Sequence, residues 1–357
     1  MMFFSIFAAI VLILLPSLVL VGTWLFHLPS ATGICEMIGT LGTGSAGQFS
    51  LNELGDCQEC EFPTRDGLRL RGTYVRRRTV ERRGVVVFCH EFGGDRHVAA
   101  PYVAGLLEEG FDVFAFDFRN HGQSEHMTGY APRTWATRYE VLDVLAAIEY
   151  VRSIDDADPE GVALVGLSRG GSAAMSAASR TDGIWALVTD GAFVSRWVTT
   201  TNIRRFMPQF VRLAPVLTRL PWFVHVIYGS VVHDLVARKV KHPCINLVND
   251  VLRLRPPSLM IHGARDSTIP VELAYRLWRR LPKRGRLWIV PKSNHNRSLR
   301  TNPVRYRQRV SRFLKNHAPR PARRPCYVMP NVSRIAAGYA VRAAETRPAA
   351  HARTTAS

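Results

Sequence analysis

The sequence has few acidic residues and few cysteines, and each shortage excludes some classes of partner or site. Its 357 residues hold 28 Asp and Glu against 47 Lys and Arg, for a net charge of +19. No DNA- or RNA-binding motif accompanies this charge, so we expect no nucleic-acid partner. A genome rich in arginine codons, or affinity for anionic lipid, explains the excess of basic residues at least as well. Among six cysteines, Cys57 and Cys60 form a C-x-x-C pair, but no second pair lies at zinc spacing. We therefore expect no metal site, and a local disulfide at this pair only in an oxidising compartment.

Charged side chains are also missing from the N-terminus, where an apolar run extends from Phe3 to Phe26. About 20 apolar residues span a bilayer. The run is longer than a usual signal-peptide core, with no basic residues before it and no convincing A-x-A cleavage site after it. We predict an uncleaved single-pass membrane anchor at 1–28, with a cleaved signal peptide as the alternative. No Lys or Arg precedes Arg65, so only the acidic residues after the span favour an extracytoplasmic location for the domain that follows.

Beyond the anchor, the composition divides the chain into a linker at 29–58, a folded domain at 59–317 and a basic, disordered tail at 318–357. The domain opens with two short strand patterns joined by an Asp-Gly turn, which predicts a hairpin. Apolar runs typical of buried strands follow at 84–89, 111–116, 161–167, 185–189, 257–261 and 286–290. Helical patterns lie at 98–109, 139–152, 169–180, 271–281 and 303–316. This alternation predicts an α/β fold, with a mostly parallel sheet covered by helices on both faces.

One stretch, residues 196–255, breaks the alternation. It is too long for a crossover connection and carries tryptophans, phenylalanines and a tyrosine between scattered arginines. An apolar insertion of this length over the end of a sheet predicts a lid that forms a substrate pocket. A helical subdomain that merely packs on the rest of the chain explains it equally well.

The sequence G-L-S-R-G-G at 166–171 follows an apolar run and precedes a helical pattern, which predicts a strand, a sharp turn and a helix. A serine at the tip of such a turn is exposed only if small residues flank it. Taken alone the motif is weak, because an ordinary glycine turn has the same composition. A serine hydroxyl becomes a strong nucleophile only when a base takes its proton and a third group orients that base. Ser168 is therefore a candidate nucleophile if the chain supplies both partners.

Two later strand ends supply them. The strand predicted at 257–261 runs into H-G-A-R-D, which places Asp266 just beyond the sheet, and the last strand runs into a loop that carries His295. Functional groups of open parallel sheets lie at the carboxyl ends of the strands. We predict a catalytic triad of Ser168, Asp266 and His295, with Asp190, at another strand end, as the alternative acid. Each residue alone has an ordinary explanation as a turn or loop residue.

Acyl transfer also needs two N–H groups directed at the developing oxyanion. We expect one from the backbone of Arg169, directly after the serine. The sequence H-E-F-G-G at 90–94 follows a predicted strand, and by register Phe92 is the expected second donor, with Glu91 less favoured. A simple glycine turn is the alternative reading of this loop.

Together these motifs resemble the α/β-hydrolase superfamily over about residues 61–317. H-E-F-G-G looks like the family's oxyanion loop, D-F-R-N-H-G-Q-S at 117–124 like its D-x-R-x-H-G-x-S loop, and H-G-A-R-D and S-N-H like its acid and histidine loops. The resemblance extends to membrane-anchored serine hydrolases of the S33-aminopeptidase-like and lysophospholipase-like kinds. It implies the α/β-hydrolase fold, with a helical lid inserted before the penultimate strand. Glu91 departs from the pattern because the family usually has glycine there, and its charge would oppose an oxyanion unless it points away or pairs, for instance with Arg169.

From these observations we expect a serine hydrolase that cleaves carboxylic esters, acyl or lipid-like, through an acyl-enzyme and without a cofactor. A peptidase or a thioesterase would use the same triad and stays an alternative. So does a catalytically inactive binding protein on the same fold, because fold alone does not prove activity. The expected partners are a small-molecule or lipid-like ester and, through the anchor, the membrane.

Overall fold

A computed structural model describes Gly33 and residues 50–154, 157–158, 160–210, 219, 221–239, 244–282 and 285–319. The predicted anchor at 1–28 lies outside the described residues, as does all of the predicted tail after residue 319. Within the described part of the chain, no helix is both long and apolar enough to cross a membrane. The anchor, its orientation and the disorder of the tail therefore stay predictions.

The folded part starts with a short 3-10 helix and a hairpin. Helix η1 (Leu51–Leu54) precedes strands β1 (Cys57–Pro63) and β2 (Arg69–Val75), which pair antiparallel as the Asp-Gly turn predicted. Leu51 is fully buried in the core, so ordered structure begins within the stretch assigned to the linker. An apolar side chain that reaches the core immobilises the backbone on either side of it.

The cysteine pair of β1 forms no disulfide. Cys57 and Cys60 are free thiols, and each donates to a different backbone carbonyl, that of Leu51 at 3.0 Å and that of Gly72 at 3.3 Å. Residues three apart on a strand point to opposite faces of the sheet, so a bridge would require β1 to be distorted. Burial raises the pKa of the Cys60 thiol to about 12, which makes it a poor nucleophile.

The sheet has eight strands in the order β1-β2-β4-β3-β5-β6-β7-β8. All pairs from β4 to β8 are parallel, and the hairpin adds antiparallel to β4. The remaining strands are β3 (Gly84–Cys89), β4 (Phe111–Phe116), β5 (Val162–Leu167), β6 (Ile184–Asp190), β7 (Ser258–Gly263) and β8 (Gly285–Val290). Their boundaries lie within two residues of the predicted ones, because each is a short apolar run bounded by turn residues. This confirms the α/β class with a mostly parallel sheet.

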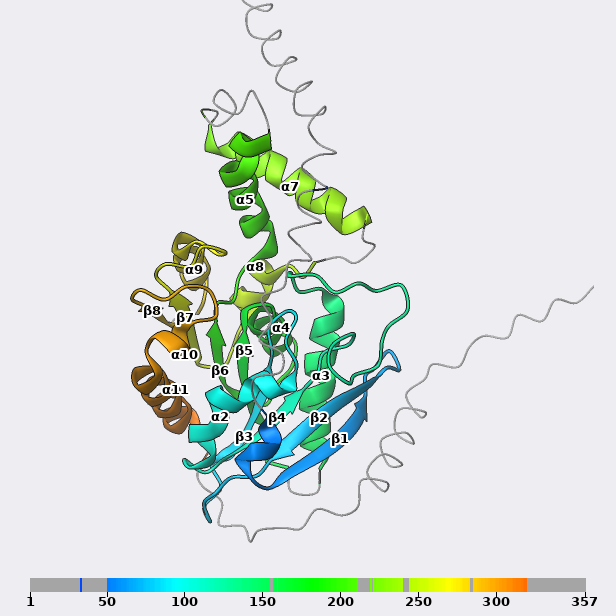
Figure 1. The fold of residues 1–357 in the computed structure, drawn as a ribbon, viewed down its shortest axis with the longest axis vertical. Coiled ribbons are helices and arrows are strands. Elements are labelled where there is room, and N and C mark those ends of the chain that lie inside the picture. Colours follow the sequence, from blue (N-terminus) through cyan, green and yellow to red (C-terminus); the bar gives the residue numbers. More distant parts are fainter. Residues whose placement is uncertain are drawn as a thin grey trace, which may run out of the picture. The chain divides into compact units, whose positions relative to one another are not determined.

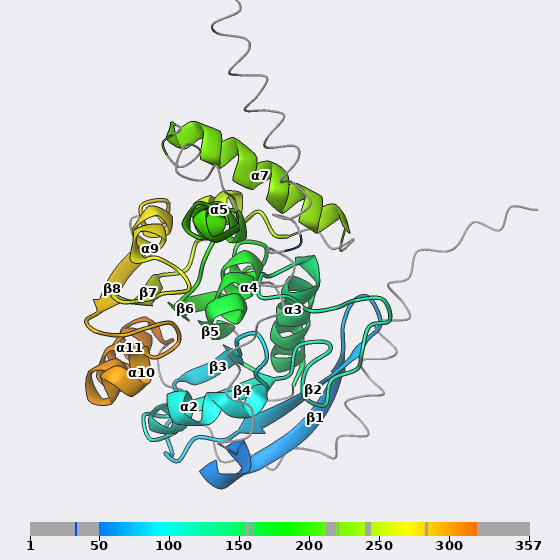
Figure 2. The same ribbon diagram turned by 45° about the horizontal axis from the view of Figure 1, so that its top comes forward.

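Helices cover both faces of this sheet (Figures 1 and 2). The helices α2 and α11 pack against each other on one face, while α3 and α4 pack together on the other. Their bounds are α2 (Ala100–Leu107), α3 (Arg138–Ser153), α4 (Ser168–Ala178) and α11 (Pro303–His317), with η2 (Arg96–Ala99) before α2. The shorter α8 (Leu247–Asp250), η3 (Val251–Arg253), α9 (Val271–Trp278) and α10 (Ser298–Thr301) complete this unit. Helix α3 begins where predicted because Thr137 and Glu140 form a capping box.

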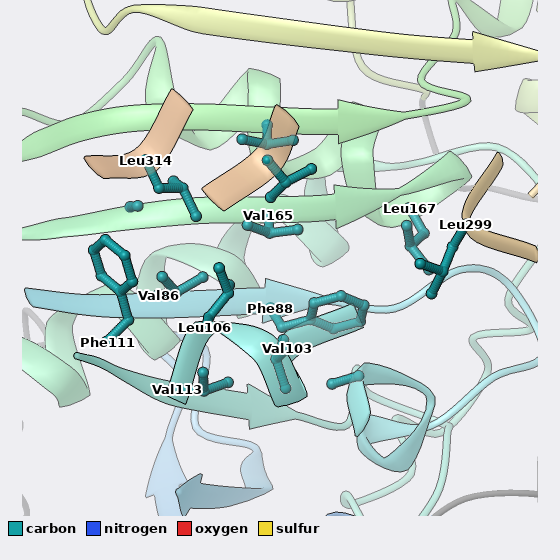
Figure 3. Packing of buried hydrophobic residues seen from close by; sticks show 14 of the residues in the cluster. Val86, Phe88, Val103, Leu106, Phe111, Val113, Val165, Leu167, Leu299 and Leu314 are labelled. Atoms are coloured by element: carbon teal, nitrogen blue, oxygen red, sulfur yellow. The ribbon is translucent and has the colours of Figure 1, made fainter. Parts of the chain in front are cut away.

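A hydrophobic core cluster lies between the sheet and the α2–α11 layer (Figure 3). Phe88 of β3, Val103 of α2, Val165 of β5 and Leu314 of α11 are among its members, and all are at most 3% exposed. Burial of an aliphatic or phenylalanine side chain is worth roughly 1.5–3 kcal/mol. The cluster fixes the strands from which the site loops emerge.

Residues 195–243 belong to a compact unit that is separate from the sheet unit, and we call their described part the helical unit. Within it, α5 (Ser195–Phe210) packs against α7 (Trp222–Lys239). Helix α7 buries one face, which includes Tyr228 and Val232, and exposes a second apolar stripe. The stripe consists of Trp222, Phe223, Val226, Ile227 and Val231. Residues 244–255 belong to the sheet unit, so the helical unit is shorter than the predicted lid of 196–255. The prediction that it acts as a lid stays a prediction.

Candidate active site

Ser168 occupies the turn between β5 and α4 in a backbone conformation that L-residues seldom adopt. Its φ is +48°, in the left-handed region, and it is the first residue of α4. Strain of this kind costs about 1–3 kcal/mol and is concentrated at functional sites. The surrounding packing therefore has to hold the serine at the tip of the turn.

The glycines around the serine are dictated by close backbone approach. A Cβ at Gly166 would lie 2.6 Å from the Gly171 Cα, and one at Gly170 would lie 2.2 Å from the His90 carbonyl oxygen. Both distances are far below van der Waals contact, so any side chain would separate α4 from β5 or from the end of β3. The absence of side chains lets the first turn of α4 lie directly against the loop after β3.

The structure brings Ser168, Asp266 and His295 into one hydrogen-bonded chain. The Oγ of Ser168 is 2.8 Å from Nε2 of His295, and Nδ1 of His295 is 2.7 Å from Oδ2 of Asp266. The three residues come from the loops after β5, β7 and β8, whose carboxyl ends share one edge of the sheet. Since a carboxylate only accepts, Nδ1 carries the proton and Nε2 is left to accept from the serine hydroxyl.

The carboxyl group of Asp266 is held by its own loop. Its Oδ1 accepts from the backbone N–H groups of Thr268 at 2.9 Å and Ile269 at 2.7 Å, which leaves Oδ2 for His295. Asp190, the alternative acid, takes no part in this chain. It is buried at the end of β6, and its Oδ1 accepts from the Ser298 hydroxyl at 2.9 Å. Burial raises the pKa of Asp190 to about 7.

The two predicted oxyanion donors lie on adjoining segments. A turn closes from the Gly94 N–H to the Glu91 carbonyl at 3.3 Å, with Gly93 at φ +75° as its third residue. Phe92, the second residue of the turn, has no acceptor for its N–H among the described residues. The Arg169 N–H belongs to the first turn of α4, where backbone donors lack intrahelical acceptors. The Arg169 guanidinium lies 5.2 Å from the Phe92 ring centre, which ties the two segments together.

Glu91 neither points into solvent nor pairs with Arg169. It is 3% exposed, and its Oε2 has no hydrogen-bond partner among the described residues. Its carboxyl carbon would lie 3.4 Å from a Cβ at Gly94, so the side chain folds back over its own loop. Burial raises the pKa of Glu91, which opposes a full negative charge beside the turn. This arrangement reduces the conflict that a charged residue would cause near an oxyanion.

A family model for the alpha/beta hydrolase fold matches residues 84–214. Among solved structures, an esterase from Pyrococcus furiosus superposes with a TM-score of 0.59 at 22% identity, over 76% of this chain and 95% of that one. The chain has the α/β-hydrolase fold. This confirms the fold that the motifs predicted and supports the expected superfamily, while the subfamily and the serine-hydrolase activity stay predictions.

Two proteins with similar sequences are an uncharacterized protein and a thiohydrolase. The uncharacterized protein YfhR of Escherichia coli K12 is 26% identical over 244 residues, which cover 67% of this chain and 73% of YfhR. The thiohydrolase aneE of Aspergillus aculeatus is 35% identical over 130 residues, which cover 36% of this chain and 39% of that protein.

The D-x-R-x-H-G-x-S loop of this fold holds the side chain of Arg169 through a hydrogen bond from the guanidinium to His121. His121 Nδ1 donates to the Arg119 carbonyl at 2.9 Å, so its Nε2 accepts from the Arg169 guanidinium at 3.1 Å. Burial and the charge of Arg169 lower the pKa of His121 to about 2, which keeps the ring neutral. Glu140 Oε1 lies 3.4 Å from the same guanidinium and balances its charge. Arg169 is thus fixed by the fold, and its ion pair among the described residues is with Glu140, not Glu91.

The sequence did not predict two residues that help to position His295. The Oδ1 atom of Asn294 accepts from the N–H groups of Ser267 at 2.9 Å and His295 at 2.8 Å, which joins the acid loop to the histidine loop. Gly191, at φ +73°, lies against the imidazole, and a Cβ there would be 3.1 Å from Cε1 of His295. Asparagine beside a candidate base and glycine after a strand are too common to signal either role.

Proposed function

We propose that the chain is a serine hydrolase that cleaves carboxylic esters through an acyl-enzyme, with Ser168 as nucleophile. The observation that carries the proposal is the unbroken hydrogen-bonded chain from the Ser168 hydroxyl through His295 to Asp266. Such a chain activates a hydroxyl that is otherwise a weak nucleophile. The family match and the esterase with the same fold agree with it.

In the proposed reaction, Ser168 Oγ attacks the acyl carbon while Nε2 of His295 takes its proton. The resulting imidazolium is stabilised by Asp266, which accepts from Nδ1 throughout. The tetrahedral intermediate then expels the alkoxide, which takes the proton from Nε2. Water, deprotonated by the same nitrogen, attacks the acyl-enzyme, and the acid leaves as Ser168 recovers its proton. No step draws on a cofactor.

The oxyanion of each tetrahedral intermediate is proposed to bind the N–H groups of Phe92 and Arg169. Two observations support this assignment: the Phe92 N–H has no acceptor in the described part of the chain, and Arg169 lies at the start of α4. Loss of one such donor typically costs about 10²–10³ in kcat. The Glu91 N–H stays the less favoured alternative.

The substrate is proposed to carry an apolar acyl group. The excess of basic residues and the apolar exposed stripe on α7 suit lipid-like esters better than short polar ones. A thioester is the second candidate, because the thiohydrolase relative shares 35% identity over 130 residues. A thioester has the same acyl carbon, so only the leaving group distinguishes the two.

The test uses a fluorophosphonate probe and a substrate panel on the full chain. We expect the probe to label the wild type and not Ser168→Ala, and p-nitrophenyl esters to be hydrolysed with a preference for longer acyl chains. Acyl thioesters assayed in parallel, by release of free thiol, separate the two candidates. Labelling that survives Ser168→Ala would refute Ser168 as the nucleophile. A wild type that neither reacts with the probe nor hydrolyses any ester or thioester would favour an inactive binding protein on this fold.

A further inference from the structure

A second imidazole approaches the carboxyl group of Asp266. His262, in β7, is fully buried, and its Nε2 lies 2.9 Å from the Ile269 carbonyl oxygen and 3.4 Å from Oδ2 of Asp266. A carbonyl oxygen only accepts, so Nε2 must carry the hydrogen. This single N–H therefore faces both the Ile269 carbonyl and the carboxylate oxygen that binds His295.

The backbone of Ile269 links His262 to the other oxygen of Asp266. Its carbonyl accepts from His262, and its N–H donates to Oδ1 of Asp266 at 2.7 Å. His262 thus orients the same residue whose N–H fixes one carboxylate oxygen, and it also approaches the other oxygen directly. Both oxygens of the acid depend on the position of this one ring.

Core packing alone does not account for a histidine here. Nδ1 of His262 has no hydrogen-bond partner among the described residues, and leaving a buried polar atom unpaired costs about 1–3 kcal/mol. Burial lowers the pKa of His262, which favours a neutral ring beside the Asp266 carboxyl group. An apolar side chain would avoid the unpaired nitrogen, and what it would lose is the Nε2–H.

We propose that His262 is a positioning residue for the reaction, with its Nε2–H holding the Asp266 carboxylate in the orientation that accepts from His295. This inference rests on the proposed function, because it assigns the role through the triad. His262 touches neither the substrate nor the reacting atoms. His262 acts on the reaction by fixing the orientation of Oδ2 of Asp266 and the conformation of the loop at 266–269.

Three substitutions of similar size separate this role from simple packing. In His262→Gln the amide nitrogen reaches the place of Nε2 and retains an N–H donor there. In His262→Asn the shorter amide reaches only the place of Nδ1, so the donor is lost while the polarity stays. His262→Phe keeps the planar ring and removes both nitrogens. The pair of amide variants remains informative even if the phenylalanine variant fails to fold.

Two readouts are measured on the full chain of each variant. We expect kcat for p-nitrophenyl ester hydrolysis to fall about 10-fold in His262→Asn and His262→Phe with KM little changed, and His262→Gln to retain most of the activity. The second readout is the far-downfield proton NMR signal of the Nδ1 hydrogen between His295 and Asp266, assigned by its loss in His295→Gln. It should shift or broaden in the Asn and Phe variants and persist in Gln.

The two readouts distinguish failure of this inference from failure of the proposed function. Folded Asn and Phe variants with wild-type kcat and an unchanged downfield signal would overturn the role of His262. Equal losses in the Gln and Asn variants would also overturn it, since the donor would then be irrelevant. If the wild type hydrolyses nothing, the proposed function fails, and the NMR signal alone decides whether His262 holds Asp266.

Discussion

Gly191 offers a sharp test of whether the position of the imidazole limits activity. It follows β6 with φ +73°, and a Cβ there would lie 3.1 Å from Cε1 of His295 and 3.2 Å from Oδ1 of Asn296. The ring cannot retreat freely, since it is held 2.7 Å from Asp266 and 2.8 Å from Ser168. Gly191→Ala should therefore lengthen at least one of these two hydrogen bonds.

The size of the effect follows from two separable costs. An L-residue in the left-handed region costs roughly 1–2 kcal/mol, which lowers the free energy of unfolding. Displacement of a catalytic group by 1 Å costs about 100-fold in rate, so a shift of a few tenths of an ångström should lower kcat on the order of 10-fold. KM should change little, because Gly191 acts on the base and not on the substrate.

Gly129→Ala is the matched control. Gly129 has nearly the same φ, +75°, but no atom of the described residues lies within 4 Å of the added Cβ. Both variants should lose similar stability in urea unfolding, and only Gly191→Ala should lose kcat and react slowly with a fluorophosphonate. Equal kcat in the two variants would refute the argument that contact with the imidazole limits activity.

Three further predictions concern the acids and the serine turn. Asp266→Asn should lower kcat by about 10⁴-fold, because the amide favours the wrong imidazole tautomer, whereas Asp190→Asn should keep kcat within a few-fold; steady-state kinetics of the pair decides between the two acids. Glu91→Gln should raise the free energy of unfolding at neutral pH. Burial raises the pKa of Glu91 above its ordinary 4.5, so the folded wild type loses stability as the pH rises through the raised pKa. The extra free energy of unfolding of Glu91→Gln should therefore vanish below about pH 4.5, as measured by urea titrations at several pH values. Gly170→Ala would place a Cβ 2.2 Å from the His90 carbonyl oxygen, and we expect a loss of more than about 3 kcal/mol in the same titrations; a wild-type midpoint would contradict the close approach of α4 to β3.

Much of the fold was predictable because its signals are local. The apolar runs at 84–89 and 111–116 coincide with β3 and β4, and the pattern at 303–316 with α11, which ends at His317. The helix predicted at 98–109 differs, since Asp95 caps a 3-10 turn, η2, before α2 begins. The capping side chain of Asp95 favours a 3-10 turn at a place where the apolar periodicity alone predicted an α-helix.

The site was predictable only in part. Chain order, strand ends and the H-G-A-R-D loop pointed to Ser168, Asp266 and His295, with Asp190 at another strand end as the alternative acid. The sequence did not indicate a role for His262, because a histidine in an apolar strand is usually a core residue. Its meaning depends on Ile269 and Asp266, which approach it only when the loop folds back.

The sequence by itself determined the order of strands and helices, the serine turn and the set of candidate groups, because these follow from periodicity and from the backbone freedom of glycine. Only the tertiary structure decided which carboxylate meets the imidazole, where Glu91 points and which glycine touches the ring of His295. These are distances between residues as far as 127 positions apart in the chain, such as Ser168 and His295. Packing of the sheet and its loops sets such distances, and no local pattern encodes them.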